Sequence, residues 1–256
     1  MWRVAGASYF GSVSAPKDSE ARRKRIERME GLGPDMIRLY QFAWSPYCLV
    51  LQGILEAGRV PFRGVDVPLG DRSMVWRLTK ERYYQVPVLK DGRNVLFETG
   101  QDSQVLAKYV DEKFGLGLFP REWEGVQPLI WRYFENDVED VTFRLNDIHW
   151  REFVAKREHC EFVRHKERRY GRGCLDAWKS GAAGLSRNLE ELLRFPEEML
   201  STREFLLTDR PLFVDFCLRG MLANYLYSGH YELPGSRPRL RAWMDRMDSV
   251  KLRTHA

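Results

Sequence analysis

Ser45 and Cys48, in the segment Ser45-Pro46-Tyr47-Cys48, are the residues of this sequence best placed to do chemistry. The apolar residues 36–42 predict a strand, and Pro46 predicts a helix start, where a proline loses no hydrogen bond. A helix start carries unpaired N–H groups and a partial positive charge. A thiolate beside Ser45 would therefore be stabilised by the backbone and by the serine hydroxyl. The alternative is that Ser45 serves only as a helix N-cap.

Residues 85–97 predict a ligand-binding edge followed by a hairpin. The run Val-Pro-Val-Leu-Lys-Asp predicts a strand with Pro87 at its start, and Asp91-Gly92 predicts the hairpin turn. In a cis Val86-Pro87 bond, the N–H and C=O of Val86 point outward and can pair with an extended peptide as an added strand. Such a ligand would be recognised through its main chain.

A third segment predicts a site for an anion and an amine. Asp102 and Ser103 open an amphipathic helix that we expect over residues 103–114. The Ser103 hydroxyl and the first-turn N–H groups can bind a carboxylate. The Asp102 carboxylate can pair with an ammonium group.

Together, these three segments resemble those of the cytosolic glutathione transferases, and the resemblance extends over most of the chain. It implies an α/β plus all-α fold, with an N-terminal thioredoxin-like domain (βαβαββα) followed by an all-helical C-terminal domain. It also implies glutathione as co-substrate. Gln85 and Val86 would bind the tripeptide, Val86 through its backbone beside a cis Pro87, and an acidic residue followed by Ser would bind the γ-glutamyl end.

Two acidic pairs are candidates for the γ-glutamyl anchor. Glu98-Thr99 lies at the family's usual distance from Pro87. Asp102-Ser103 lies farther from the proline but has the usual spacing to the helix and to Tyr109. We favour Asp102-Ser103 and keep Glu98 as the alternative.

The Ser45-Pro46-Tyr47-Cys48 segment also resembles the C-P-Y-C of glutaredoxins and the C-P-F of omega-like transferases, with the first Cys replaced. The first Cys is the attacking one, so the main nucleophile of that motif is missing. Cys48 is more simply interpreted as a small buried hydrophobe. A Ser in the first position resembles transferases that bind glutathione as a thiolate. Tyr40 is the runner-up activator, although a packed strand aromatic is its simpler role.

The chain divides into four predicted segments. They are an Arg-rich N-terminal extension (residues 1–34), the thioredoxin-like domain (35–114), a linker (115–122) and the all-helical domain (123–256). In the last, an amphipathic stripe is formed by Leu185, Leu189, Leu192 and Leu193. The run FLLTDRPLFVDF resembles the family's FLxGDRPTxADF, with Leu212 in place of the helix-capping hydroxyl residue and Asp215 kept.

The resemblance places an electrophile pocket between the two domains, lined by the first helices of the second. Phe134, Phe143, His149 and Trp150 are the candidates, because an apolar cleft with a few polar groups suits a small hydrophobic electrophile. Each of these side chains could equally be part of the core, and His149 could be a packing histidine.

Composition narrows the function classes. The four cysteines show no C-x-x-C spacing, so neither a metal site nor a disulfide framework is expected. The net charge is only +5, and the basic residues are interleaved with acidic ones. This charge pattern is typical of a solvated surface and argues against nucleic acid as a partner. No apolar run is long enough for a membrane span, and the first residues lack the apolar centre of a signal peptide. We expect a cytoplasmic protein without membrane contact, and the resemblance to glutathione transferases implies a homodimer.

Three functions remain open at this stage. The first is glutathione transfer to an electrophile, with Ser45 hydrogen-bonding the thiolate. The second is a glutathione-dependent thiol reductase or peroxidase in which Cys48 or bound glutathione itself takes part. The third is a non-catalytic binding or regulatory protein with the transferase fold. Fold alone does not separate them.

Overall fold

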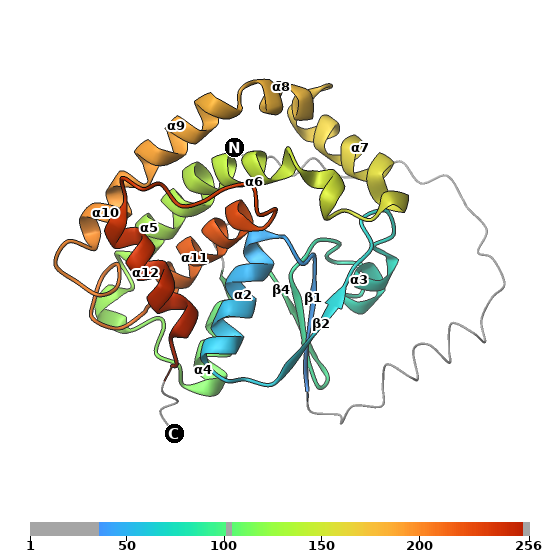
Figure 1. Ribbon diagram of the computed structural model, residues 1–256. Coiled ribbons are helices and arrows are strands. Elements are labelled where there is room, and N and C mark those ends of the chain that lie inside the picture. The colour runs from blue at the N-terminus through green and yellow to red at the C-terminus, as the bar shows by residue number, and fades with distance from the viewer. Residues whose placement is uncertain (1–35, 101–103, 253–256) are drawn as a thin grey trace. The chain divides into compact units, whose positions relative to one another are not determined.

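A four-stranded sheet forms the framework of the N-terminal part (Figure 1). The computed structural model describes residues 36–100 and 104–252. The elements follow the predicted order: β1 (Ile37–Gln41), α2 (Pro46–Ala57), β2 (Phe62–Asp66), α3 (Ser73–Leu78), β3 (Val88–Asp91), β4 (Asn94–Phe97) and α4 (Val105–Phe114). The strand order is β2-β1-β3-β4, with β1 parallel to β2 and β3 antiparallel to both neighbours.

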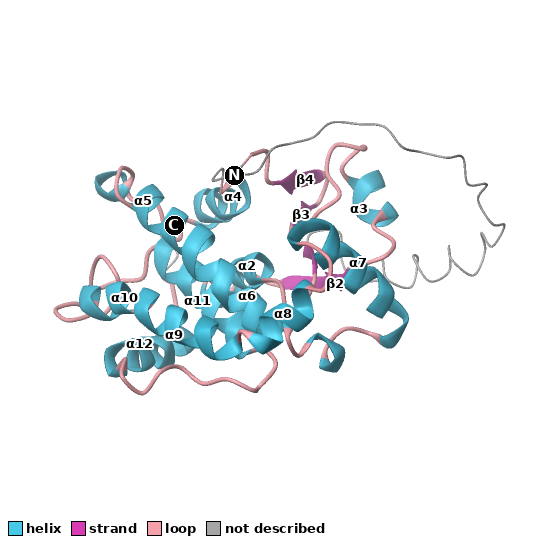
Figure 2. Ribbon diagram, turned by 90° about the horizontal axis from the view of Figure 1, so that it is seen from above, coloured by secondary structure: helices cyan, strands magenta, loops and turns pink. Residues whose placement is uncertain are grey.

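Helix α2 supplies the crossover that two parallel strands require. It begins at Pro46, with Ser45 in an extended conformation before it, and ends at Gly58, as the sequence predicts. Figure 1 and Figure 2 show α2 and α3 on opposite sides of the sheet. The inner face of α2 is formed by Leu51, Ile54 and Leu55, which are almost fully buried.

The predicted hairpin joins β3 to β4. Asp91 pairs with Asn94 across the turn, and Gly92 has a φ of +55°, a conformation that favours glycine. Tyr109 Oη donates a hydrogen bond to Asp91 Oδ2 at 2.6 Å, and Lys113 forms an ion pair with the same carboxylate. Helix α4 is thereby tied to the hairpin.

The rest of the described chain is helical, as predicted. Its elements are η1 (Arg121–Trp123), α5 (Gln127–Tyr133), the π-helical η2 (Phe134–Val138), α6 (Glu139–Asp147), η3 (Trp150–Glu152), η4 (Lys156–Glu158), α7 (His159–Tyr170), α8 (Cys174–Ser180), α9 (Ala182–Leu192), α10 (Arg194–Met199), α11 (Phe213–Leu226) and α12 (Pro238–Ser249). Among the described residues, no helix combines the length and the apolar composition needed to span a bilayer.

One hydrophobic core joins the sheet part to the helical part. It includes Leu39 of β1 and Ile54 of α2 together with Trp131 of α5 and Phe216 of α11. The predicted leucine stripe of α9 contributes Leu189, which is 1% exposed. The two parts therefore stabilise each other through shared apolar burial.

Gly220 allows α11 to lie directly against the first turn of α2. A Cβ at this position would lie 2.8 Å from the Pro46 carbonyl oxygen and would collide with the Val50 side chain. The Pro46 carbonyl oxygen belongs to the backbone of α2, so it cannot move away from an added Cβ unless that helix shifts. Because Gly220 has no side chain, α11 can pack closely against the helix start that follows Ser45.

We expect Gly220→Ala to lower the free energy of unfolding by about 1–3 kcal/mol, because the added methyl overpacks this contact. Gly184→Ala in α9 is the matched control, since no atom lies within 4 Å of its added Cβ. That control should raise stability by up to about 1 kcal/mol through helix propensity. Urea unfolding measures both, and equal effects of the two substitutions would contradict the packing argument.

The start of α11 confirms the prediction made for Leu212 and Asp215. Leu212 provides no side-chain cap, yet its backbone N–H donates to Asp215 Oδ2 at 2.9 Å. Asp215 Oδ1 accepts two further bonds, from the Leu206 N–H at 2.9 Å and from Trp243 Nε1 at 3.0 Å. This buried carboxylate connects the segment before α11, its first turn and α12.

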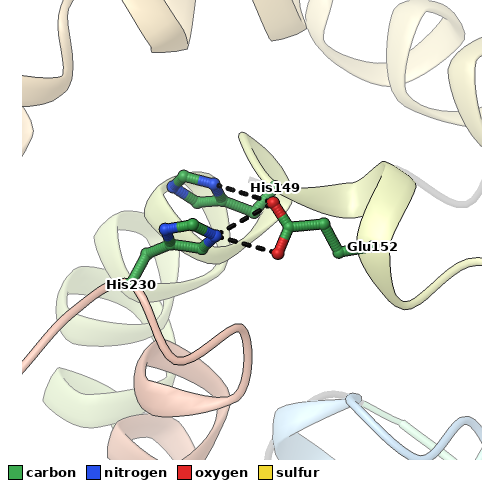
Figure 3. Close-up of side chains that lie close together, drawn as sticks. All are labelled: His149, Glu152 and His230. Carbon is green, nitrogen blue, oxygen red and sulfur yellow. Dashed lines mark hydrogen bonds and ion pairs between the residues drawn. The ribbon is translucent and has the colours of Figure 1, made fainter.

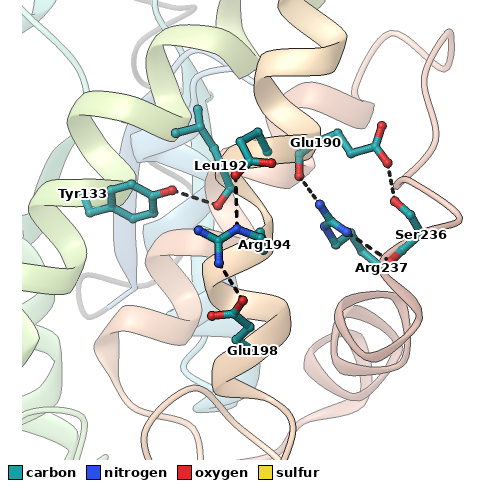
Figure 4. Close-up of polar contacts among 8 residues, drawn as sticks. Tyr133, Glu190, Leu192, Arg194, Glu198, Ser236 and Arg237 are labelled. Carbon is teal, nitrogen blue, oxygen red and sulfur yellow. Dashed lines mark hydrogen bonds and ion pairs between the residues drawn. The ribbon is translucent and has the colours of Figure 1, made fainter.

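A set of polar contacts links α9 to α5 and to the segment before α12 (Figure 4). Tyr133 Oη of α5 donates to the Leu192 carbonyl at 2.8 Å. Arg237 Nη2, just before α12, donates to the Glu190 carbonyl of α9 at 2.8 Å. Within α10, Arg194 pairs with Glu198 at 2.7 Å. The first two contacts hold the C-terminal end of α9 against α5 and against the residue before α12.

Candidate functional site

The turn between β1 and α2 positions Ser45. The Ser45 N–H donates to the Phe42 carbonyl at 3.0 Å, and the Ser45 carbonyl accepts the first helical bond from the Leu49 N–H at 2.9 Å. The Ser45 side chain makes no capping hydrogen bond to the helix. The alternative in which Ser45 only caps α2 is therefore not favoured. Its hydroxyl stays at the positive end of the helix dipole.

Helix α11 supports this turn from behind. Asn224 Nδ2 donates to the Trp44 carbonyl at 2.7 Å across 180 residues of sequence. Trp44 also stacks on Phe42, with ring centroids 5.6 Å apart, and packs against Phe153 at 5.4 Å. The residue before Ser45 is thus held by a hydrogen bond and by two aromatic rings.

Cys48 lies one turn farther along α2 and is completely buried. Burial raises the pKa of its thiol to about 12, although hydrogen bonding to Ser45 and to the Phe42 backbone opposes the shift. At neutral pH the thiol is protonated and out of reach of solvent. These properties match the expectation of a small buried hydrophobe. Tyr40 is also buried, at 7% exposure, as expected for a packed strand aromatic.

The second segment has the predicted backbone. The Val86-Pro87 bond is cis, and the ladder between β1 and β3 begins at Val88. Gln85 and Val86 are half-buried, whereas Pro87 is buried. Val86 thus precedes the paired part of the strand, where its backbone can meet an extended ligand.

The third segment differs from the prediction at its start. Helix α4 begins at Val105 rather than at Ser103, and Gln104 before it adopts a left-handed conformation with φ +49°. Asp102 and Ser103 lie outside the described residues. The choice between the two anchor pairs therefore stays open.

Glu98 occupies the first turn of α4. Its Oε2 accepts a hydrogen bond from the Val105 N–H at 2.9 Å, and its Oε1 accepts one from the Leu106 N–H at 3.2 Å. A carboxylate is the group that a helix N-terminus prefers. The observed role of Glu98 is to hold this helix, while Thr99 beside it is exposed.

Two residues that the sequence analysis did not single out lie close to this segment. Burial and the charge of Glu98 raise the pKa of Tyr83, whose ring stacks on Phe97 at 5.1 Å. The Arg72 guanidinium lies 5.0 Å from the centre of the Phe42 ring. No local motif marks either residue, because Arg72 lies in the loop before α3 and Tyr83 in the loop between α3 and β3.

Acidic residues of η2 and α6 and basic residues of α7 lie near the first turn of α2. Burial and the charges of Glu139 and Glu135 raise the pKa of Tyr47. Burial also raises the pKa of Glu139 to about 7, although Lys166 and Arg169 oppose it. The sequence pattern predicts mainly apolar groups from the first helices of this part. It does not indicate these charged residues, because they are brought together only by tertiary packing. The π-helical turn η2 precedes Glu139, and such turns are common at functional sites.

The predicted pocket residues have different surroundings. Phe134, Phe143 and Trp150 are 1%, 5% and 3% exposed and form part of the core. Half-buried His149 stacks on His230, with ring centroids 3.7 Å apart. A separate surface cavity of about 710 Å³ runs along α7, and its lining shares only Trp150 with the predicted site.

Comparison with known proteins gives matches at the level of family and fold. The family model for the glutathione S-transferase N-terminal domain matches residues 39–118, and the model for the C-terminal domain matches residues 176–249. No curated protein sequence matches the chain.

Many solved structures share its fold, and three of them illustrate the similarity. A glutathione transferase from Phanerochaete chrysosporium is 18% identical, with a TM-score of 0.73 over 86% of this chain and 99% of its own. A glutathione S-transferase of Ceriporiopsis subvermispora, in complex with glutathione, is 14% identical, with a TM-score of 0.72 over 87% and 100%. Glutaredoxin 2 from Salmonella typhimurium, in complex with glutathione, is 19% identical, with a TM-score of 0.65 over 85% and 97%.

Proposed function

Because this chain belongs to the glutathione S-transferase superfamily, we propose that it transfers glutathione to a small hydrophobic electrophile and that Ser45 stabilises the attacking thiolate. The observation that carries this proposal is the Ser45 side chain, which makes no capping bond at the start of α2. The same hydroxyl lies within hydrogen-bonding reach of the Cys48 thiol, and it can instead donate to the sulfur of a bound glutathione. The cis Val86-Pro87 bond supports the same arrangement, since it presents the Val86 backbone to an extended tripeptide.

The proposed reaction needs a thiolate. Glutathione binds along Val86 and loses its thiol proton to solvent, and the Ser45 hydroxyl donates a hydrogen bond to the sulfur. The partial positive charge at the start of α2 adds to this stabilisation. The sulfur electron pair then forms a C–S bond with the electrophile, and any leaving group departs with the pair from its own bond.

Aromatic side chains beside Ser45 support a hydrophobic electrophile. Trp44 packs between Phe42 and Phe153, and Phe153 packs against Tyr227 at a centroid distance of 5.5 Å. Tyr227 is 40% exposed. These rings are more accessible than the core residues Phe134 and Trp150, so we assign the apolar contact mainly to them. His149 remains a proposed polar neighbour, and a cytoplasmic homodimer belongs to the same proposal.

A redox function is the second candidate, because a glutaredoxin 2 is among the proteins that share the fold. In that case Cys48 would have to attack a disulfide. Its burial and its raised pKa disfavour such an attack.

Turnover tests the proposal directly. Purified protein is mixed with glutathione and a panel of aryl halides and enones, and the loss of free thiol and the formation of conjugate are followed together. We expect equal amounts of conjugate formed and thiol consumed. Thiol loss with glutathione disulfide as the product would favour the redox candidate. Glutathione binding without turnover would favour the non-catalytic one.

The anchor can be assigned by a pair of matched substitutions. We expect Ser103→Ala to weaken glutathione binding by about 1–3 kcal/mol, because a bound carboxylate loses a hydrogen-bond donor. Thr99→Ala is the control and should bind normally. Substituting Glu98 is less informative, since Glu98 caps α4. Calorimetry measures both variants, and a loss confined to Thr99→Ala would move the anchor to Glu98-Thr99.

A further inference from the structure

Three metal-ligating side chains converge outside the proposed thiolate site (Figure 3). Glu152 lies at the end of η3, and His149 immediately precedes that element. His230 comes from the loop between α11 and α12, 78 residues beyond Glu152. One potential ligand atom from each side chain lies within 4.8 Å of the other two.

Two histidine side chains contact the Glu152 carboxylate. His230 Nε2 lies 2.8 Å from Glu152 Oε2 and 2.9 Å from Oε1. His149 Nδ1 lies 3.7 Å from Glu152 Oε1. Figure 3 shows a nitrogen of each imidazole directed toward the same carboxylate.

The surrounding backbone and rings hold the histidines side by side. The imidazole rings stack with an interplanar angle of 11°, and Tyr231 packs edge-on against His149 at 5.6 Å. The His149 N–H donates to the Asn146 carbonyl at 3.0 Å, and the Glu152 N–H donates to the His149 carbonyl at 3.0 Å. The cluster is therefore largely assembled by the fold.

We propose that His149, Glu152 and His230 bind one divalent transition-metal ion, with zinc as the best fit. Two imidazole nitrogens and one carboxylate oxygen are the ligand type that zinc, nickel and copper prefer, whereas calcium and magnesium prefer oxygen ligands alone. Around a tetrahedral zinc with bonds of about 2.1 Å, ligand atoms lie about 3.4 Å apart. The distances from the Glu152 carboxylate oxygens to His230 Nε2 (2.8 Å) and to His149 Nδ1 (3.7 Å) are respectively shorter and longer than this ligand separation.

A small adjustment completes the coordination. Because the rings are nearly parallel, they must tilt toward each other to aim both nitrogens at one ion. The His230 side chain is 44% exposed and stands in a loop, so it has room to turn. The exposed side of the cluster leaves the fourth position to water. The bound ion would then cross-link η3 to the loop that follows α11.

Zinc titration of the untagged full-length protein tests this site. Cys160 is exposed and could bind zinc by itself, so all measurements use a Cys160→Ser background without glutathione. We expect titration calorimetry to show that one zinc ion binds per chain. In thermal unfolding, the midpoint temperature should rise when zinc is added and fall back to the metal-free value when EDTA removes it. Magnesium should give no heat of binding.

Substitutions identify the ligands. His149→Ala, His230→Ala and Glu152→Gln should each weaken zinc binding about tenfold or more. His165→Ala is the matched control, because His165 is an exposed histidine outside the cluster and should leave binding unchanged. Glu152→Gln keeps the size of the side chain and separates ligand loss from misfolding. Absence of one-to-one binding, or binding that persists in all three cluster variants, would overturn the proposal.

Discussion

Asp215→Ala is expected to lower the free energy of unfolding by about 3 kcal/mol or more, the largest stability loss predicted for this protein. The carboxylate is fully buried and accepts hydrogen bonds from the N–H groups of Leu206 and Leu212 and from Trp243 Nε1. Burial raises its pKa to about 6 despite these bonds, so it is mostly ionised at neutral pH. Its removal leaves three buried donors without a partner, and each costs about 1–3 kcal/mol.

Chemical denaturation at pH 7 measures the Asp215 effect. Asp248→Ala is the matched control: Asp248 pairs with Arg219 at the surface, its side chain is 54% exposed, and such pairs contribute about 0–1 kcal/mol. Asp215→Asn should lie between wild type and Asp215→Ala, because the amide keeps one acceptor oxygen. If Asp215→Ala lost no more stability than Asp248→Ala, the capping network would not hold α11 as described.

Ser45→Ala is expected to have the largest effect on activity. A hydrogen bond to a charged partner is worth about 1.5–3 kcal/mol, so its loss should raise the pKa of the bound glutathione thiol by about 1–2 units. Thiolate is the reactive form, so conjugation near neutral pH should slow by about 10- to 100-fold and recover as the pH rises above the new pKa. A pH profile of kcat/KM for wild type and variant measures this shift.

Cys48→Ser is the control for that experiment. The Cys48 thiol is buried and its pKa is raised to about 12, so replacing it should change the conjugation rate and its pH profile little. Any disulfide-reductase activity should be weak and should survive the substitution. Loss of all activity in Cys48→Ser with Ser45→Ala still active would establish the redox candidate instead.

Features set by local sequence were predictable. Pro46 and Gly58 mark the ends of α2 within a residue, and Asp91-Gly92 specifies the hairpin turn, because backbone conformation at these positions depends on the residues themselves. The cis bond at Pro87 follows from the family resemblance and is present. Leu212 and Asp215 likewise have the predicted roles at the start of α11.

Features set by long-range packing were not predictable. Glu98 accepts hydrogen bonds from the first turn of α4 although it lies seven residues before Val105, where the helix begins. The effect of Glu139 on Tyr47 depends on how the helices pack beside the first turn of α2. His230 meets Glu152 across 78 residues, and neither spacing nor periodicity marks that pair.

Calorimetric titration of the wild-type protein with glutathione tests the central claim most directly. Cysteinylglycine, which lacks the γ-glutamyl group, is the matched ligand. We expect glutathione to bind with one site per chain and cysteinylglycine to bind at least about tenfold more weakly, because it cannot use the anchor at the start of α4. No detectable binding of glutathione at millimolar concentration would contradict the account and leave a protein with the transferase fold but another ligand.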